Sequence, residues 1–278
     1  MQIQMTPTSY YDKYGYFFSS SQSDQFDGCK KKWEYDKFSN VQPHKMNFFP
    51  FEYGTYVHDM LEHTLEAKKD NVRKSRMFDY ISRNPRSAKV NTHMGRNEVM
   101  FHIENVMIPR FQALENAKQT CEIELGVKAP EDWFREGYLD VFLPHYPNVK
   151  FIGFRGKIDF YGKDMKDGKI KIIDWKTGKP RGYKMKSYEE QVAQYSYLFY
   201  AHGYEFDEVS LYFVDAREEI QISSDVEKGE DLIRTKLKRH INWLQDNTVF
   251  PKTVSQDCNI CQFNLKCQKN DSVVLQMW

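Results

Sequence analysis

Apolar and polar positions follow two periods along the chain, and each period predicts a different kind of element. Residues 55–69 place apolar side chains at i, i+3, i+4, i+7 and i+8, which predicts an amphipathic helix. Residues 67–118 are charged, and a spacing of three to four in their second half predicts a helical layer. From residue 121 the pattern becomes that of strands, at 121–127, 138–143, 150–162 and 169–178.

The rest of the chain mixes the two patterns. Helices are predicted at 188–201 and 231–245, and strands at 208–215 and 219–222. Neighbouring strands flanked by helices predict an α/β fold with a mixed central sheet. Because 278 residues without a long linker fit one elaborated domain, we predict a single domain over 1–278. Its predicted parts are an N-terminal segment at 1–50, a helical part at 51–120, a core at 121–225 and a C-terminal part at 226–278.

Composition excludes several classes of protein. Aromatic residues make up 15% of the chain, which is unlike a disordered protein. A bilayer needs about 20 consecutive apolar residues, and the sequence has neither such a run nor a signal peptide. We therefore expect a soluble cytoplasmic protein without a membrane partner, in which five cysteines do not form a disulfide framework.

The net charge of +1 gives no global attraction to nucleic acid, so any basic surface must be local. Residues 157–186 hold ten Lys or Arg against four Asp. Phosphate contacts of this kind bind without reading sequence, and we predict that DNA is contacted by Lys157, Lys179, Arg181 and Lys184. A second basic run at 68–89 is either a solvated helix face or another wall of the same channel.

Two carboxylates and a lysine are predicted to converge. If 150–162 and 169–178 form one hairpin, Asp159 and Asp174 lie opposite one another, and Lys176 shares the face of Asp174 because strand side chains alternate. Such a group suits metal-dependent phosphodiester hydrolysis by Mg²⁺ or Mn²⁺. Taken alone, an Asp-x-Lys pair at a strand end is more often a solvated surface.

Four motifs in a fixed order favour the catalytic interpretation of these residues over a solvated surface. They are GTYVH at 54–58, GKID at 156–159, DWKTG at 174–178 and QVAQY at 191–195. With them the sequence resembles the PD-(D/E)XK nuclease superfamily, and within it the RecB-like exonucleases, which include the AddB nuclease domain and the CRISPR-associated RecB-like exonucleases. The resemblance covers about 20–65 and 121–267 and leaves 66–120 as a helical insertion. Ile158 replaces the proline of the family name, and Asp174 a frequent glutamate.

The resemblance implies roles for individual residues. His58, Asp159 and Asp174 would bind the divalent ion, with the backbone carbonyl of Trp175 as a further ligand, and Lys176 would be catalytic. Gln191 would touch the active site or the DNA strand, and Tyr195 would support it. For the last two residues, which share a helix face, packing in the core is the alternative. A helix-surface histidine is the alternative for His58.

The cysteines give a second signal. Cys258, Cys261 and Cys267 crowd one short segment, and Cys29 is the candidate fourth ligand, while Cys121 begins a strand and fits the core. By spacing alone, four thiolates suit tetrahedral zinc or a [4Fe-4S] cluster. The same family resemblance favours the iron–sulfur cluster, which would act as a staple between the two ends of the chain.

These observations predict a metal-dependent DNA exonuclease that hydrolyses phosphodiester bonds from DNA ends, with single strands as the expected substrate. The expected setting is repair, recombination, phage DNA metabolism or CRISPR adaptation in a bacterial, archaeal or phage-infected cell. No Walker motif is present, so a helicase, recombinase or CRISPR integrase is an expected partner, and a homo-oligomer is possible. The alternatives are a sequence-specific endonuclease of the same superfamily and a non-catalytic DNA-binding scaffold subunit.

Overall fold

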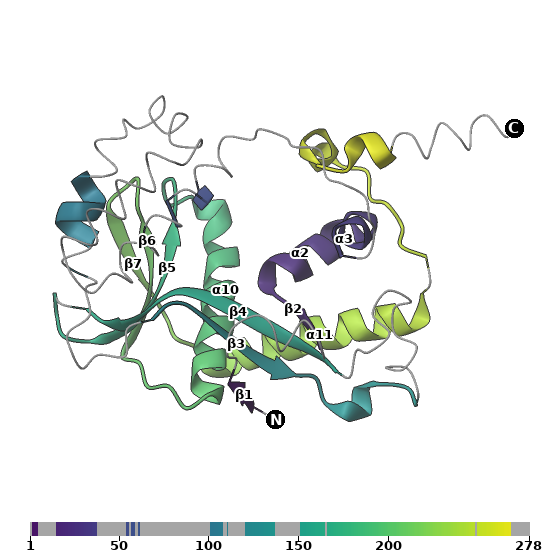
Figure 1. The fold of residues 1–278 in the computed structure, drawn as a ribbon, viewed down its shortest axis with the longest axis horizontal. Helices are drawn as coiled ribbons and strands as arrows, with labels where there is room; N and C mark the ends of the chain where they lie inside the picture. The colour runs from purple at the N-terminus through teal and green to yellow at the C-terminus, as the bar shows by residue number, and fades with distance from the viewer. Residues whose placement is uncertain are drawn as a thin grey trace, which may run out of the picture. The chain divides into compact units, whose positions relative to one another are not determined.

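The structure is a computed structural model, drawn in Figure 1. It describes residues 2–4, 15–37, 54, 55, 57, 58, 61, 101–107, 110, 120–136, 151–164, 166–247 and 249–267. The chain divides into two compact units. The first unit comprises Met1–Pro7, Phe49–Val127 and Arg155–Arg234, and the second comprises Thr8–Phe48, Lys128–Phe154 and Thr235–Trp278.

A mixed sheet forms the core of the first unit. Its strands run in the order β1 (Gln2–Gln4), β3 (Thr120–Lys128), β4 (Ile152–Lys163), β5 (Ile170–Lys176), β6 (Glu208–Phe213) and β7 (Glu218–Ile222). β4 and β5 are antiparallel, β5 and β6 parallel, and β6 and β7 antiparallel. The predicted α/β fold with a mixed sheet is thereby confirmed.

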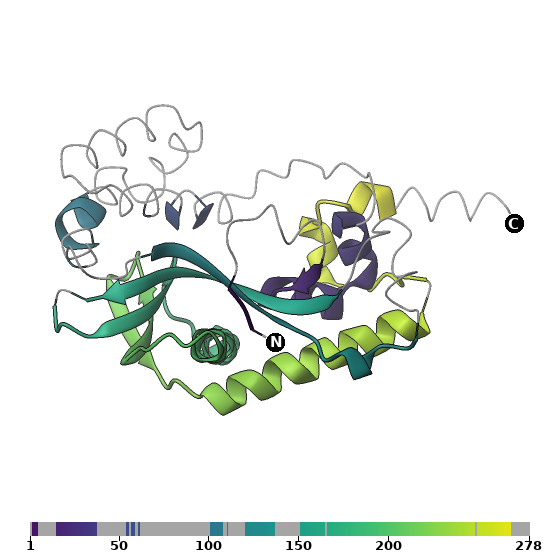
Figure 2. The same cartoon turned by 60° about the horizontal axis from the view of Figure 1, so that its bottom comes forward.

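Helix α10 (Gly182–Ala201) covers one face of this sheet (Figure 2). Its buried residues include Val192, Leu198 and Phe199, which supply the apolar contact. Helix α11 (Val226–Asp246) begins beside α10, where a Cβ added at Gly229 would lie 2.0 Å from a backbone oxygen of Ala193. Only glycine allows this approach of the two helices.

Both helices begin earlier than the sequence pattern predicts, α10 by six residues and α11 by five. The additional turn of α10 is exposed at Tyr183 and Lys184, so it carries no apolar period. Residues 54, 55, 57, 58 and 61 are helical, and 103–107 form a π-helical turn. Residues 101, 102 and 110 are helical as well, while the predicted strand at 138–143 and the remaining positions of the helical layer lie outside the described residues. Among the helices that the structure describes, none is both long and apolar enough to cross a membrane.

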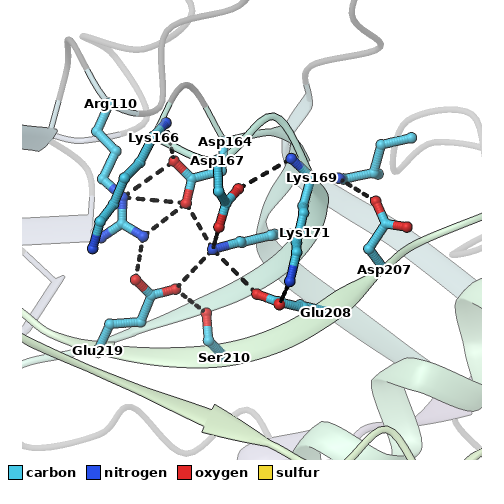
Figure 3. Close-up of polar contacts among 11 residues, drawn as sticks. Arg110, Asp164, Lys166, Asp167, Lys169, Lys171, Asp207, Glu208, Ser210 and Glu219 are labelled. Carbon is cyan, nitrogen blue, oxygen red and sulfur yellow. Dashed lines mark hydrogen bonds and ion pairs between the residues drawn. The ribbon is translucent and has the colours of Figure 1, made fainter.

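A buried ionic network lies on the face of the sheet opposite to the one that α10 covers (Figure 3). The Lys171 ammonium lies 2.8 Å from Asp164 Oδ2 and 3.3 Å from Glu208 Oε2. Arg110 pairs with the same Asp164, at 2.7 Å, and with Glu219 on β7. Because side chains alternate along a strand, Lys171 and residue 174 project from opposite faces of β5. The network therefore anchors β5 without occupying the face that α10 covers.

The second unit is built on aromatic packing. It contains β2 (Tyr16–Phe18), α2 (Ser20–Gly28), α3 (Lys30–Lys37) and η3 (Gln256–Ile260). β2 pairs in parallel with the first three residues of β4. The rings of Phe18 and Trp33 stack at 5.6 Å, and Phe26 meets Trp33 edge-on at 4.9 Å. Both Phe18 and Trp33 are fully buried, so these rings form the core of this unit.

Candidate active site

The site begins where the β4 and β5 ladder ends. The register pairs Phe160 with Ile173, and its next step sets Asp159 opposite Asp174. One residue further along β5, the Trp175 N–H donates to the side chain of β4 residue Asp159, at 2.7 Å from Oδ2. The N–H and C=O of one strand residue point toward the same neighbour, so the Trp175 carbonyl is directed toward β4 as well.

Asp174 and Lys176 share one face of β5 and form an ion pair of 2.5 Å. Asp174 is 5% exposed. Burial raises the pKa of its carboxyl group above the ordinary value; Lys176 opposes this effect and Asp159 adds to it. Burial lowers the pKa of the Lys176 ammonium, while Asp174, Asp159 and Tyr188 raise it, and the net shift is upward. Lys176 is therefore a cation at neutral pH beside a poorly solvated carboxyl group.

His58 is one of the helical residues 54, 55, 57, 58 and 61. Its Nδ1 lies 3.2 Å from Asp159 Oδ1. Burial lowers the pKa of the imidazole, while the Asp159 carboxylate raises it, and the net shift is upward. A Cβ added at Gly54 would lie 3.4 Å from Thr177 Oγ1, so this segment runs close to the loop after β5. The histidine motif and the aspartate motif therefore meet in space.

Helix α10 brings the glutamine and tyrosine of the fourth motif to the same place. Lys176 Nζ donates to Gln191 Oε1 at 2.9 Å, and Gln191 Nε2 donates to the Tyr195 hydroxyl at 2.8 Å. Burial raises the pKa of Tyr195 well above its ordinary value, and the Asp174 and Asp159 carboxylates act in the same direction. A Cβ added at Gly156 would lie 2.9 Å from the Tyr195 ring, so glycine is needed on β4 where α10 passes.

The donor set suits a hard divalent cation. Two carboxylates, an imidazole and a backbone carbonyl are ligands typical of Mg²⁺ and Mn²⁺ sites. Within the described ranges, no three His, Cys, Asp or Glu side chains already stand in the geometry of a metal site. Instead, His58 and Lys176 each contact one carboxylate. The burial of Asp174 beside a second carboxylate is the feature that a cation would relieve, so the residues fit the ion.

Sequence reasoning missed Asp215. Gly178 has a φ of +92°, which favours glycine, and its N–H donates to Asp215 Oδ2 at 2.9 Å. Asp215 follows β6, whose pairing with β5 is parallel, so the carboxyl ends of the two strands meet at one edge. An aspartate directly after the buried pattern at 208–214 was the signal available in the sequence.

The predicted DNA-binding residues are exposed. Lys157 lies on β4, Lys179 and Arg181 in the loop after β5, and Lys184 in the first turn of α10. Arg181 donates to the hydroxyl of Tyr183 at 3.2 Å, and the Tyr183 side chain is exposed as well. All of these residues belong to the first unit, which also holds the carboxylates.

The second unit holds the cysteines with predicted cofactor roles. Cys29 and Cys258 accept backbone N–H groups of Thr253 and Ser255, each at 3.5 Å. Burial raises the pKa of the Cys267 thiol, and the thiols of Cys261, Cys29 and Cys258 raise it further, so the four lie in one neighbourhood. Cys121 belongs to β3 of the first unit.

The fold and the cluster of carboxyl groups and lysine define an α/β protein whose D-x-K motif lies on β5, next to Asp159 on β4. The family model for the PD-(D/E)XK nuclease superfamily matches residues 18–268. The chain therefore belongs to this superfamily, a class of phosphodiester hydrolases that implies DNA as the substrate.

Two solved structures are similar to the chain, and the first of them shares its fold. A protein from Eubacterium rectale, described as a "Putative exonuclease", is 14% identical, with 94% of each chain covered and a TM-score of 0.54. The protein SSO0001 is 15% identical over 88% of this chain and 93% of its own, with a TM-score of 0.34. No protein of curated function matches the chain.

Proposed function

We propose that the protein is a metal-dependent deoxyribonuclease that hydrolyses DNA from its ends, with single strands as the substrate. The convergence of Asp159, Asp174 and Lys176 beside His58 carries this proposal. The protein from Eubacterium rectale that is described as a "Putative exonuclease" has the same fold, and that description agrees with an attack on ends. Repair, recombination, phage DNA metabolism and CRISPR adaptation, with a helicase, recombinase or integrase partner, stay predictions.

Each residue of the site has a separate role in the proposed hydrolysis. His58, Asp159, Asp174 and the Trp175 carbonyl would hold Mg²⁺ or Mn²⁺. When bound, such an ion polarises the phosphoryl oxygen and lowers the pKa of a water. In hydrolysis a water oxygen bonds to phosphorus while the bond from phosphorus to the leaving oxygen breaks; a proton of that water passes to solvent, and the leaving oxygen takes up a proton from solvent. Lys176 presents a positive charge where negative charge develops on the phosphoryl oxygens.

Gln191 and Tyr195 position this lysine. The ammonium has three N–H donors, of which one meets Gln191 and one Asp174. The hydrogen bond from Gln191 to the Tyr195 hydroxyl fixes the orientation of the amide, so its oxygen faces Lys176. These two oxygens hold the positive charge of the ammonium in place for the reacting phosphate.

We also propose that Cys29, Cys258, Cys261 and Cys267 bind a [4Fe-4S] cluster that staples the second unit. Support comes from the shared neighbourhood of the four thiols. Structural Zn²⁺ is the alternative, since thiolates bind both. Iron and acid-labile sulfide are measured on anaerobically purified protein. Cys267→Ser should lose iron, whereas Cys121→Ser should keep it; zinc without sulfide would favour the alternative.

The decisive test of the nuclease uses end-labelled linear single-stranded DNA and closed circular DNA. Each is incubated with Mn²⁺, Mg²⁺ or EDTA, beside Lys176→Ala. Metal-dependent loss of the linear substrate alone, abolished by the substitution, is the expected result. Cleavage of the circle at fixed sites would favour the endonuclease alternative. Binding without cleavage in every metal would contradict the catalytic assignment and favour a scaffold subunit.

A further inference from the structure

The Lys176 ammonium meets a third group, the ring of Tyr188. Lys176 Nζ lies 4.8 Å from the ring centroid. A cation within about 6 Å of an aromatic face is attracted by the ring quadrupole. The other two contacts of the ammonium are oxygens, of Asp174 at 2.5 Å and Gln191 at 2.9 Å. The ring is therefore a further contact that limits the movement of the Lys176 side chain.

Helix geometry explains why Tyr188 reaches the site. Tyr188, Gln191 and Tyr195 stand at i, i+3 and i+7 of α10, which is one helix face. Two of the three already form the hydrogen-bonded chain to Lys176. A residue one turn earlier on the same face lies beside that chain, so the placement of Tyr188 follows from the same period.

The Tyr188 ring also contacts a buried residue of the sheet. Its centroid lies 6.2 Å from that of Phe213 on β6, and Phe213 is buried at 1% exposure. The parallel register pairs Phe213 with Lys176. The ring thus contacts a fixed core residue on the neighbouring strand and the ammonium on β5, which orders it before any substrate binds.

We propose that Tyr188 is a positioning residue for the nuclease reaction, whose ring face keeps the Lys176 ammonium directed at the reacting phosphate. The proposal rests on the proposed function and adds a residue to the machinery of the same site. It requires the aromatic face and not the hydroxyl. A displacement of about 1 Å at a reacting group costs on the order of 100-fold in rate, which sets the size of the expected effect.

Kinetics distinguish positioning from binding. Tyr188→Phe keeps the ring, whereas Tyr188→Leu and Tyr188→Met remove it. Tyr200→Leu, at an exposed position of the same helix, is the matched control. We expect both ring-free variants to lower kcat by about 10- to 100-fold at an unchanged KM, and Tyr188→Phe and Tyr200→Leu to retain wild-type kcat. A raised KM with unchanged kcat would overturn the proposal and assign Tyr188 to stacking on a DNA base.

A spectroscopic measurement separates this proposal from the proposed function. In protein carrying lysine labelled with ¹³C at Cε, the Lys176 signal is identified by its absence in Lys176→Arg. We expect a ring-current shift that persists in Tyr188→Phe and is lost in Tyr188→Leu. If the wild type cuts no DNA, the proposed function fails, yet this signal still reports the contact. A signal that is the same with and without the ring would overturn the proposal whatever the activity.

Discussion

At the scale of single residues, two aspartates of similar kind stand at the two ends of β6. Asp207 accepts the Ile170 N–H at 2.8 Å where β5 begins, and Asp215 accepts the Gly178 N–H at 2.9 Å where β5 has ended. Each is a side chain to backbone hydrogen bond, and such a bond contributes about 1 kcal/mol to stability. Of these two aspartates, Asp215 is the one that binds the backbone of the loop after Lys176.

We therefore predict different outcomes for the same truncation. Asp207→Ala and Asp215→Ala should each lower the free energy of unfolding by about 1 kcal/mol, measured by urea denaturation. Only Asp215→Ala should lower kcat on end-labelled DNA, because it frees the backbone next to Lys176. Equal kcat losses in the two variants would mean that the loop has no part in positioning the site.

The sequence predicted some of the site residues and not others. Strand alternation was enough to place Asp174 and Lys176 on one face opposite Asp159. The contact of Lys176 with Gln191 could not be predicted in this way. An i, i+4 pattern identifies a helix face, but it does not identify the strand that this face packs against. Tyr188 was missed as part of the site for the same reason, since its contact with Lys176 also depends on how α10 meets β5. Asp215 was missed because its contact depends on the parallel pairing of β5 with β6, and parallel partners are distant in sequence.

At the scale of elements, the ionic network of Figure 3 ties β5 to its surroundings. Lys171 is 4% exposed and contacts Asp164, which is fully buried. Removing one partner of a buried ion pair costs about 3–5 kcal/mol, because it leaves an uncompensated charge. Lys171→Met should therefore lower the free energy of unfolding by about that amount in chemical denaturation.

A neighbouring lysine supplies the control for this variant. Lys169 pairs with Glu208, but its side chain is 48% exposed, so water replaces the contact. Lys169→Met should leave the denaturation midpoint nearly unchanged. If the two variants lost equal stability, burial would not be what makes the network important.

The same network predicts acid sensitivity. Burial acts to raise the pKa of Asp164, but its hydrogen bonds from Arg110 and Lys171 outweigh this and lower it from 3.8 to about 2. A carboxyl group whose pKa is lowered by folding stabilises the protein at every pH above the pKa that the group has in the unfolded chain. That contribution is lost as the pH falls from about 3.8 to about 2.

Asp164→Asn removes this titration. The stability difference between wild type and variant should be largest above pH 4 and should narrow by about 2 kcal/mol as the pH falls toward 2. The measurement is the free energy of unfolding in denaturant at several pH values. A difference that stays constant with pH would show that Asp164 has an ordinary pKa in the folded protein.

At the scale of the whole molecule, the two compact units were not visible in the sequence. Three of their five boundaries fall inside β3, β4 and α11 rather than in linkers, so no shift in composition marks those three. The mixed sheet, by contrast, followed from strand patterns and short turns. The single nuclease domain over 1–278 and its four parts stay predictions, as does the homo-oligomer.

Charge also acts at the scale of the molecule, since a net charge of +1 leaves DNA binding to the local basic surface. Each phosphate contact adds about 0.7 to the slope of log affinity against log salt for single strands. Arg181→Gln should therefore lower that slope by about this amount, measured by fluorescence anisotropy of labelled single-stranded DNA in EDTA. Lys228→Gln makes the same change in net charge at an exposed position on α11 and should leave the slope unchanged. Equal effects of the two substitutions would show that binding follows net charge, and the basic surface beside the carboxylates would then have no special role.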